Sequence, residues 1–162
     1  MKITLCGFMG CGKTTKGKIL AERLGIDFFD SDFLVEQTEK RSINEIFAAD
    51  GEEYFRRCEG EAIKQLACGE GDCVISVGGG AVMNAENADI LRKNSTVIFI
   101  ETPVEVICER LSTDSSRPLF NVENVRELYQ KRLPFYKEAA DIIVSDNSSA
   151  EETVDEIVRL LG

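Results

Sequence analysis

Residues 7–15 read GFMGCGKTT and come directly after the apolar run Ile3–Cys6. A glycine, four residues, a second glycine, a lysine and a threonine have the spacing of a phosphate loop, in which backbone N–H groups wrap the phosphates of a nucleotide. Lys13 would reach the outer phosphates, and the Thr14 hydroxyl would bind the accompanying Mg²⁺ ion. The apolar run predicts a buried strand, and the residues that follow the loop have the apolar spacing of a helix that ends with Gly25 as its C-cap. This context predicts a nucleotide-phosphate site rather than an ordinary glycine-rich turn.

The 162-residue chain has the length of one compact domain. No apolar stretch approaches the roughly 20 residues that span a bilayer, and the N-terminus lacks the layout of a secretory signal. We therefore expect a cytoplasmic protein that binds no membrane. A net charge of −10 with no histidine disfavours nucleic-acid binding, although local arginines could hold a small anion.

The six cysteines include no C-x-x-C pair, and the chain has no histidine to complete a mixed metal site. A disulfide framework and a zinc site are therefore both disfavoured. We expect most of the cysteines to be reduced residues of the core. Cys11 differs because it lies inside the loop, where oxidation or alkylation of its thiol would block nucleotide binding.

Short apolar runs alternate with helical patterns along the whole chain, which predicts a parallel sheet covered by helices on both faces. The expected strands are Ile3–Cys6, Asp27–Asp30, Val74–Val77, Val97–Ile100 and Ile142–Ser145. The sequences SINE at 42–45 and TPVE at 102–105 both fit the capping box that starts a helix, the second with Pro103 at the first helical position.

Two acidic residues, Asp30 and Asp32, come at the end of the second expected strand. In open parallel sheets the ligand crevice lies at the carboxyl ends of the strands, where the phosphate loop also lies. One carboxylate could hold a water of the magnesium shell, while the other orients or deprotonates an attacking hydroxyl. The alternative is a capping role, in which Asp32 or Ser31 starts the following helix.

Two adjacent arginines, Arg56 and Arg57, lie on one expected helix and point about 100° apart. Arg57 shares its face with Glu61 and Lys64, a solvated and charge-paired face. Arg56 shares its face with a small residue, Gly60, and is therefore the better candidate for a ligand contact. Two ordinary surface arginines are the alternative.

Arg132 falls on the apolar stripe of the helix that contains Val125, Leu128 and Tyr129. A half-buried guanidinium needs an anionic partner, which can be a ligand carboxylate or phosphate, or an internal acidic residue. Three consecutive glycines, Gly78–Gly80, follow the third expected strand. Either a ligand touches this backbone, or a tight turn there needs positive φ angles.

Residues 112–121 read STDSSRPLFN and show no periodicity. A loop of this length in a compact domain is typical of a lid or a binding loop, with an idle surface loop as the alternative. Arg117 lies beside the stiff Pro118, where a lid closing over phosphates would need a cation.

The combination of DSD, FRR, GGGAV and RLPFY with the phosphate loop resembles the shikimate kinase family over essentially the whole chain. The resemblance implies one domain, residues 1–162, with the α/β fold of phosphate-loop NTPases of the nucleoside-monophosphate-kinase type. Its central five-stranded parallel sheet would be flanked by helices, with a phosphate loop at 7–14, an acceptor-binding region at about 31–60 and a mobile lid at about 112–121. It also implies transfer of the ATP γ-phosphoryl group to the 3-hydroxyl of shikimate, with Mg²⁺, by a cytoplasmic monomer.

The resemblance further assigns roles to individual residues. It implies catalytic roles for Lys13, Asp32 and Arg117. It implies nucleotide contacts by Gly10, Cys11, Gly12, Lys13, Thr14, Thr15, Arg110 and Arg117. It implies shikimate contacts by Asp32, Arg56, Gly78, Gly79, Gly80 and Arg132, with the two arginines on the carboxylate. It implies metal contacts by Thr14 and, through water, Asp30.

Two other functions share the phosphate loop. A gluconate-type or other small-metabolite kinase would not be expected to combine DSD, FRR and GGGAV. A GTPase switch would need an Asn-Lys-x-Asp run and an Asp-x-x-Gly run, and the sequence contains neither.

Overall fold

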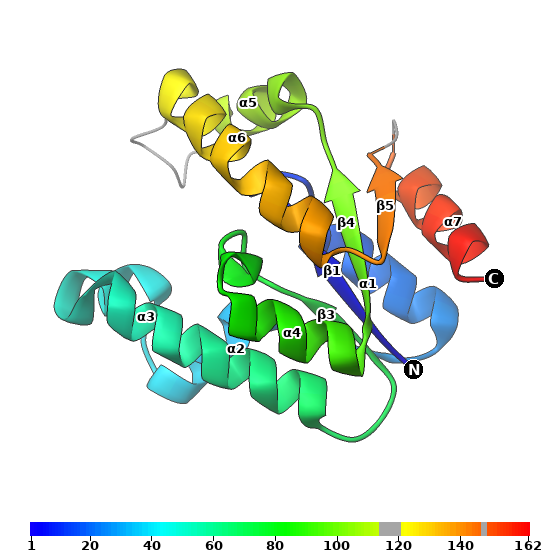
Figure 1. Cartoon of the computed structure of the whole chain (residues 1–162), viewed down its shortest axis with the longest axis horizontal. Coiled ribbons are helices and arrows are strands. Elements are labelled where there is room, and N and C mark those ends of the chain that lie inside the picture. Colours follow the sequence, from blue (N-terminus) through cyan, green and yellow to red (C-terminus); the bar gives the residue numbers. More distant parts are fainter. Residues whose placement is uncertain (114–120, 147–148) are drawn as a thin grey trace.

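The computed structural model describes residues 1–113, 121–146 and 149–162. Five strands form one sheet in the order β2-β3-β1-β4-β5, and every neighbouring pair is parallel (Figure 1). The strands are β1 (Lys2–Cys6), β2 (Asp27–Asp30), β3 (Cys73–Ser76), β4 (Thr96–Glu101) and β5 (Ile142–Ser145). The predicted parallel sheet is confirmed, and every predicted strand end lies within one residue of the observed one.

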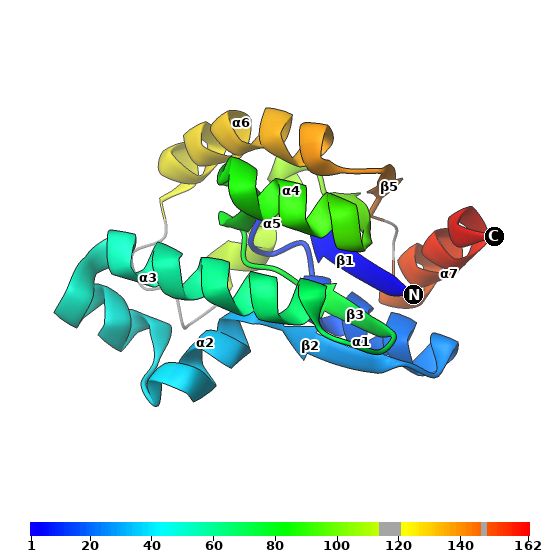
Figure 2. The same ribbon diagram turned by 60° about the horizontal axis from the view of Figure 1, so that its bottom comes forward.

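Helices cover both faces of the sheet (Figure 2). They are α1 (Lys13–Leu24), α2 (Ser31–Glu39), α3 (Ile43–Cys68), the short 3-10 helix η1 (Ala81–Met83), α4 (Ala85–Asn94), α5 (Val104–Ser112), α6 (Val122–Ala139) and α7 (Ala150–Leu161). Helices α1 and α7 pack on one face, and α3, α4, α5 and α6 contribute to the core on the other. As predicted, Gly25 ends α1 in the left-handed conformation.

Alternate residues of the central strands enter two separate cores. Ile98 and Ile100 of β4 pack toward α1 and α7, whereas Val97 and Phe99 pack toward the opposite helices. All four residues are fully or almost fully buried, as expected for a parallel strand that is covered on both faces. The phosphate loop therefore leaves β1 from the centre of a rigid sheet.

Helices α2 and α3 pack together through a smaller cluster of their own, which contains Val35, Ile46 and Phe55. The predicted capping box is present at the start of α3, where the Ser42 hydroxyl accepts from the Glu45 N–H and the Glu45 carboxylate accepts from the Ser42 N–H. This helical pair extends beyond the sheet on the side of β2.

The second predicted capping box is wrong. Helix α5 begins at Val104 with Pro103 as its N-cap residue, and no side chain caps it. The Thr102 hydroxyl instead donates to the buried carboxylate of Asp146, 2.9 Å away. The Thr102 hydroxyl therefore bonds to a residue distant in the sequence and does not cap the helix, although the local pattern had predicted that it would.

Most of the expected lid, including Arg117, lies outside the described residues. Among the helices of the described ranges, none combines the length and the apolar character needed to cross a membrane.

Candidate active site

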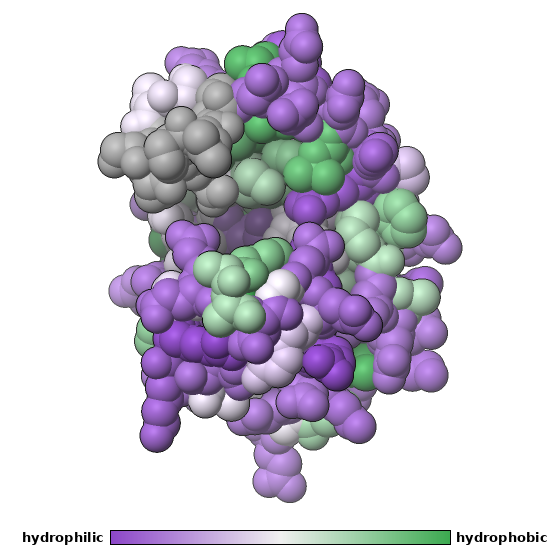
Figure 3. Space-filling model, turned by 90° about the vertical axis from the view of Figure 1, so that its left-hand side faces the viewer, coloured by the Kyte–Doolittle hydropathy of each residue, from purple (hydrophilic) through white to green (hydrophobic). Residues whose placement is uncertain are grey.

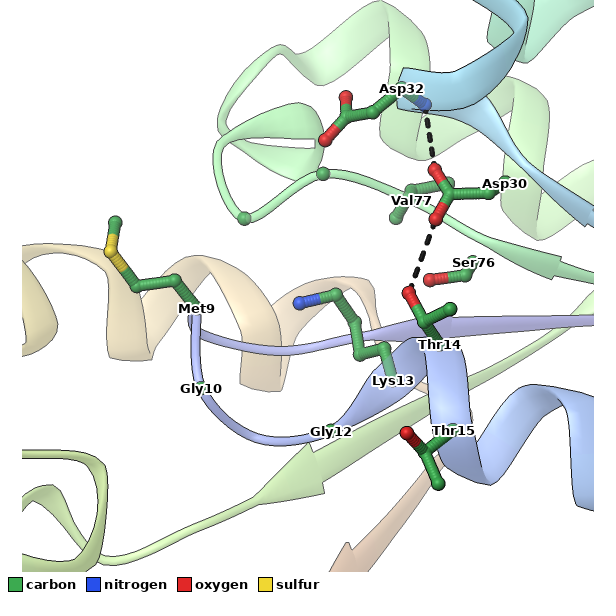
Figure 4. Close-up of a pocket in the computed structure, with 12 residues that line it drawn as sticks. Met9, Gly10, Gly12, Lys13, Thr14, Thr15, Asp30, Asp32, Ser76 and Val77 are labelled. Carbon is green, nitrogen blue, oxygen red and sulfur yellow. Dashed lines mark hydrogen bonds between the residues drawn. The ribbon is translucent and has the colours of Figure 1, made fainter. Parts of the chain in front are cut away.

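A cavity of about 300 Å³ lies at the carboxyl ends of β1, β2 and β3 (Figure 4). The phosphate loop forms one wall, and residues that follow β2 and β3 form the other. On the side shown in Figure 3, the molecular surface is hollowed near its centre. The cavity brings together nine of the residues predicted from the sequence: Gly10, Gly12, Lys13, Thr14, Thr15, Asp30, Asp32, Gly78 and Gly79.

The phosphate loop is shaped by glycines in the left-handed conformation. Gly10 has φ 83° and Gly12 has φ 79°, and α1 begins directly after Gly12. Such angles are strained for other residues, so the glycines let the loop turn into the first helical N–H groups. The Lys13 ammonium donates to the Gly7 carbonyl, 2.8 Å away, at the edge of the cavity. Cys11 is fully buried, and this burial opposes the thiol reactivity expected from its place in the loop.

Asp30 uses its two carboxylate oxygens for different purposes. Oδ1 accepts from the backbone N–H of Asp32, 2.9 Å away, and from that of Phe33, so Asp30 is the N-cap residue of α2. Oδ2 accepts from the Thr14 hydroxyl, 3.2 Å away. A capping role was considered for Asp32 or Ser31, and that assignment is wrong. The Ser31 hydroxyl is buried without a partner in the described part of the chain.

Asp32 points into the cavity with a buried oxygen, Oδ1, that has no hydrogen-bond partner among the described residues. Burial, together with the nearby carboxylates of Glu59 and Asp30, raises the pKa of Asp32 to about 6. The charges of Lys13 and Arg56 oppose this rise. A buried polar atom without a partner is costly, and the Asp32 side chain that carries it lines a cavity that a ligand can enter.

The three glycines after β3 are needed for space. A turn is present there, with the Ala81 N–H donating to the Gly78 carbonyl at 3.0 Å, but none of the three glycines has the positive φ that the alternative required. A Cβ atom at Gly78 would lie 2.9 Å from both Asp32 Oδ1 and Glu59 Oε2. At Gly79 a Cβ atom would lie 3.1 Å from Arg132 Nη1, and at Gly80 it would lie 2.7 Å from Arg56 Nη2. The segment thus brings together side chains from three helices, α2, α3 and α6.

The two arginines proposed for shikimate binding have different environments. Arg56 Nη1 donates to Glu59 Oε1, 2.9 Å away, and its side chain is 32% exposed. Arg132 lies over the ring of Phe8, with 5.8 Å between its Cζ and the ring centroid. Within the described ranges, no carboxylate lies within salt-bridge distance of Arg132. Arg57 is exposed, as the choice between the adjacent arginines predicted.

Glu59 is a residue of the site that the sequence analysis did not select. Its carboxylate is 2% exposed and holds Arg56 in place. Burial raises the pKa of Glu59, while the charges of Arg56 and Arg132 oppose the rise. Glu59 could have been found from the sequence, because a residue three positions after Arg56 lies on the same face of the helix.

Arg110 approaches the phosphate loop from α5. Its Nη1 donates to the Gly10 carbonyl and to Asp146 Oδ2, each 2.9 Å away. Asp146 also forms a buried ion pair with Lys16, at 3.1 Å. Asp146 and Lys16 were not predicted, although Lys16 lies four residues before Leu20 and thus on the buried stripe of α1. The reasoning that selected Arg132 would have selected Lys16 too.

The described residues contain no cluster of three or more acidic, cysteine or histidine side chains that could hold a metal ion. Two oxygens beside the loop, the Thr14 hydroxyl and Asp30 Oδ2, lie 3.2 Å apart. A threonine hydroxyl and an outer-shell carboxylate suit Mg²⁺, which prefers oxygen ligands and keeps several of its waters when it is bound with phosphates.

The sheet order and the loop at the end of β1 define a phosphate-loop protein of the α/β class. A family model described as "Shikimate kinase" matches residues 9–162. The chain is 41% identical to the shikimate kinase of Bacillus cytotoxicus, over 99% of this chain and 98% of that protein. It is 42% identical to the shikimate kinase of Symbiobacterium thermophilum, over 99% and 96% of the two chains. The chain therefore belongs to the shikimate kinase family, as the sequence motifs indicated.

Solved structures show the same fold. The shikimate kinase of Acinetobacter baumannii, determined in complex with shikimate, has a TM-score of 0.92 and 35% identity, with 99% of this chain and 92% of that chain covered. The shikimate kinase of Aquifex aeolicus has a TM-score of 0.86 and 40% identity, with 99% and 96% covered. The predicted fold class is confirmed.

Proposed function

We propose that this chain transfers the γ-phosphoryl group of ATP to the 3-hydroxyl of shikimate. Membership of the shikimate kinase family supports the reaction, and the observation that carries the proposed site is the orphaned Oδ1 of Asp32. The Asp32 side chain lines a cavity together with the phosphate loop, Gly78 and Gly79. The two arginines do not line this cavity, but Arg132 lies beside Gly79 and Arg56 beside Gly80.

The nucleotide side is formed by the loop and by arginines beside it. The N–H groups at the start of α1 cradle the phosphates, and Lys13 stabilises the charge on the transferring phosphoryl group. Arg110, held at the Gly10 carbonyl, contacts the nucleotide. Arg117, which lies outside the described residues, would supply a further positive charge. The loop contacts are those of Gly10, Cys11, Gly12, Lys13, Thr14 and Thr15.

Magnesium belongs on the same side. The Thr14 hydroxyl would hold the ion, and Asp30 would hold it through a water at Oδ2, since Oδ1 is committed to the cap of α2. When it is bound, the ion would supply positive charge that stabilises the phosphates of ATP.

The acceptor side recognises shikimate by its carboxylate and its hydroxyls. Arg56 and Arg132 grip the carboxylate, which supplies the anion that Arg132 lacks among the described residues. Gly79 and Gly80 bring backbone against the substrate, and Gly78 leaves room for the Asp32 carboxylate. The Asp32 carboxylate accepts the hydrogen bond of the reacting hydroxyl.

The reaction then needs one proton transfer and one phosphoryl transfer. As the 3-hydroxyl oxygen forms its bond to the γ-phosphorus, the bond from that phosphorus to the bridging oxygen breaks and ADP leaves. The hydroxyl proton passes to Asp32, whose raised pKa of about 6 suits a base that works near neutral pH. Shikimate 3-phosphate and ADP are the products.

We further propose that the enzyme works as a monomer in the cytoplasm and uses no nucleic-acid or membrane partner. The net charge of −10 supports the lack of affinity for nucleic acid. Sedimentation of the purified protein with and without ATP tests the monomer.

A coupled ADP-release assay tests the function. Shikimate, gluconate and no acceptor are compared at the same concentrations of magnesium and ATP. We expect ADP release with shikimate only. Faster release with gluconate would indicate another small-metabolite kinase, and equal release without an acceptor would indicate a simple NTPase.

A further inference from the structure

Asp146 lies directly after β5, and both oxygens of its carboxylate contact side chains from other elements. Oδ1 forms an ion pair with Lys16 at 3.1 Å and accepts from the Thr153 hydroxyl at 3.3 Å. Oδ2 accepts from the Thr102 hydroxyl and from Arg110, both at 2.9 Å. The Asp146 side chain is only 4% exposed. One buried carboxylate thus joins two cations that come from different helices, α1 and α5.

Both cations hold the phosphate loop. The Lys16 ammonium donates to the Cys11 carbonyl, and Arg110 donates to the Gly10 carbonyl. The two carbonyls are consecutive, so this stretch of loop backbone is held through one carboxylate. Lys16 also fills the space beside Gly12, since a Cβ atom there would lie 2.8 Å from its Nζ. The ion pair is therefore built into the wall of the loop.

Fixing the Cys11 carbonyl also fixes the next N–H. The described residues contain no cis peptide bond, and in a trans peptide the carbonyl and the following N–H point in opposite directions. The direction of the Gly12 N–H, a group of the phosphate cradle, is thus set by Lys16. The same holds for Arg110 and the peptide that follows Gly10.

We propose that Asp146 is a positioning residue for nucleotide binding, acting through Lys16 and Arg110 to hold the phosphate loop in its binding shape before ATP arrives. The proposal rests on the proposed phosphate site. Preorganisation lowers the ordering cost of binding, so its loss reduces ATP affinity. Burial opposes the ionisation of Asp146, but hydrogen bonds from Lys16, Thr102 and Arg110 outweigh it and hold its pKa below the usual range.

A purely structural role makes a different prediction. Removing one partner of a buried ion pair leaves an uncompensated charge and destabilises the fold, whereas replacing both partners by neutral groups of similar volume restores much of the stability. Stability and ATP affinity can therefore be separated by comparing Asp146→Asn with the double variant Lys16→Met and Asp146→Asn.

The experiment measures thermal unfolding, ATP binding by calorimetry without shikimate, and the KM values of both substrates. For Asp146→Asn we expect a lower melting temperature, about tenfold weaker ATP binding and an unchanged KM for shikimate. In the double variant the melting temperature should recover toward that of the unmodified protein, while ATP binding should stay about tenfold weak. Recovery of ATP affinity together with stability would overturn the proposal.

Thr102→Val is the matched control, because it removes one hydrogen bond to the same carboxylate without touching the loop or its cations. Its ATP affinity should stay unchanged, and an ATP affinity as weak as that of Asp146→Asn would count against the proposal.

Lys13→Ala separates this proposal from the proposed phosphate site. Normal turnover in Lys13→Ala would refute the phosphate site itself. Loss of turnover in Lys13→Ala with normal ATP binding in Asp146→Asn would refute only the positioning role.

Discussion

The two halves of the cavity are prepared for their ligands in opposite ways. On the nucleotide side, hydrogen bonds from Lys16 and Arg110 hold the loop carbonyls, and the Lys13 ammonium donates to the loop itself. On the acceptor side, Asp32 Oδ1 is buried without a partner among the described residues. One half is internally satisfied, and the other retains an unpaired polar oxygen.

This difference follows from what each half must recognise. Phosphates are bound largely by backbone N–H groups, whose directions the fold can set in advance. A small hydroxylated acid is recognised by side chains, and Asp32 Oδ1 has no hydrogen-bond partner among the described residues, whereas Arg56 is already paired with Glu59. Crowding of Asp32, Glu59, Arg56 and Arg132 around Gly78–Gly80 is the result. Variants of the loop should therefore impair nucleotide chemistry, and variants of the crowded cluster should impair acceptor recognition.

Lys13→Ala should have the largest effect. The lysine stabilises charge on the transferring phosphoryl group, so we expect turnover to fall by about 10³-fold or more while the fold remains intact. Steady-state ADP release and circular dichroism measure the two quantities. Lys18→Ala, which removes an exposed lysine of the same helix, is the control and should keep its turnover. Near-full turnover in Lys13→Ala would show that the loop is not a phosphate site.

Asp32→Asn should have the next largest effect, and it tests the acceptor half alone. Asparagine keeps the size of the side chain but cannot take the hydroxyl proton, so turnover should fall by roughly 10²-fold or more. Affinity for magnesium-ATP should barely change, because Thr14 and Asp30 serve the metal side. Single-turnover transfer and ATP calorimetry without shikimate provide the pair of measurements. Unchanged transfer with weakened ATP binding would exchange the roles of Asp30 and Asp32.

The fold was predictable because its signals are local and repeated. Each strand is a short apolar run, and burial of β4 on both faces explains why its four central residues, Val97–Ile100, are all apolar. The capping box at Ser42 was predictable for the same reason, since it involves only four consecutive residues. The capping box at Thr102 failed because its hydroxyl bonds to Asp146, a residue 44 positions away, and no local pattern contains that information.

A site residue could be predicted where its type departs from the pattern of the residues around it. Arg132 on an apolar stripe and three glycines after a strand both stood out, but the contacts that the glycines permit were not visible in the sequence. Asp146 gave no signal, because it is one polar residue among several after a strand. Its importance comes from Lys16 and Arg110, which reach it from distant segments.

Arg132→Ala should lower the affinity for shikimate more than Arg132→Lys does, and the lysine variant should still bind shikimate more weakly than the unmodified protein. An ammonium cannot reproduce the planar grip of a guanidinium on a carboxylate, so the loss should be on the order of 2 kcal/mol in shikimate affinity. Lys131→Ala, which removes a neighbouring exposed charge, is the control. Methyl shikimate lacks the carboxylate charge and should bind almost equally to the variants and the unmodified protein. An equal loss for methyl shikimate would show that Arg132 does not read that group.

Gly80→Ala should have the smallest effect, because it adds only one methyl group to the acceptor half. It tests most closely whether the acceptor half can be changed without changing the nucleotide half. That group would lie 2.7 Å from Arg56 Nη2, the end of a flexible side chain, so the guanidinium shifts while the backbone stays in place. Partial loss of a charge-assisted contact should raise the KM for shikimate about tenfold and leave the melting temperature and ATP affinity nearly unchanged. Gly60→Ala is the control, since its methyl group would meet only Asn87 Oδ1 at 3.4 Å, an ordinary contact.

If Gly80→Ala weakened ATP binding as much as shikimate binding, the two halves would not be independent. If it changed neither, Arg56 would not need its present position to hold the acceptor.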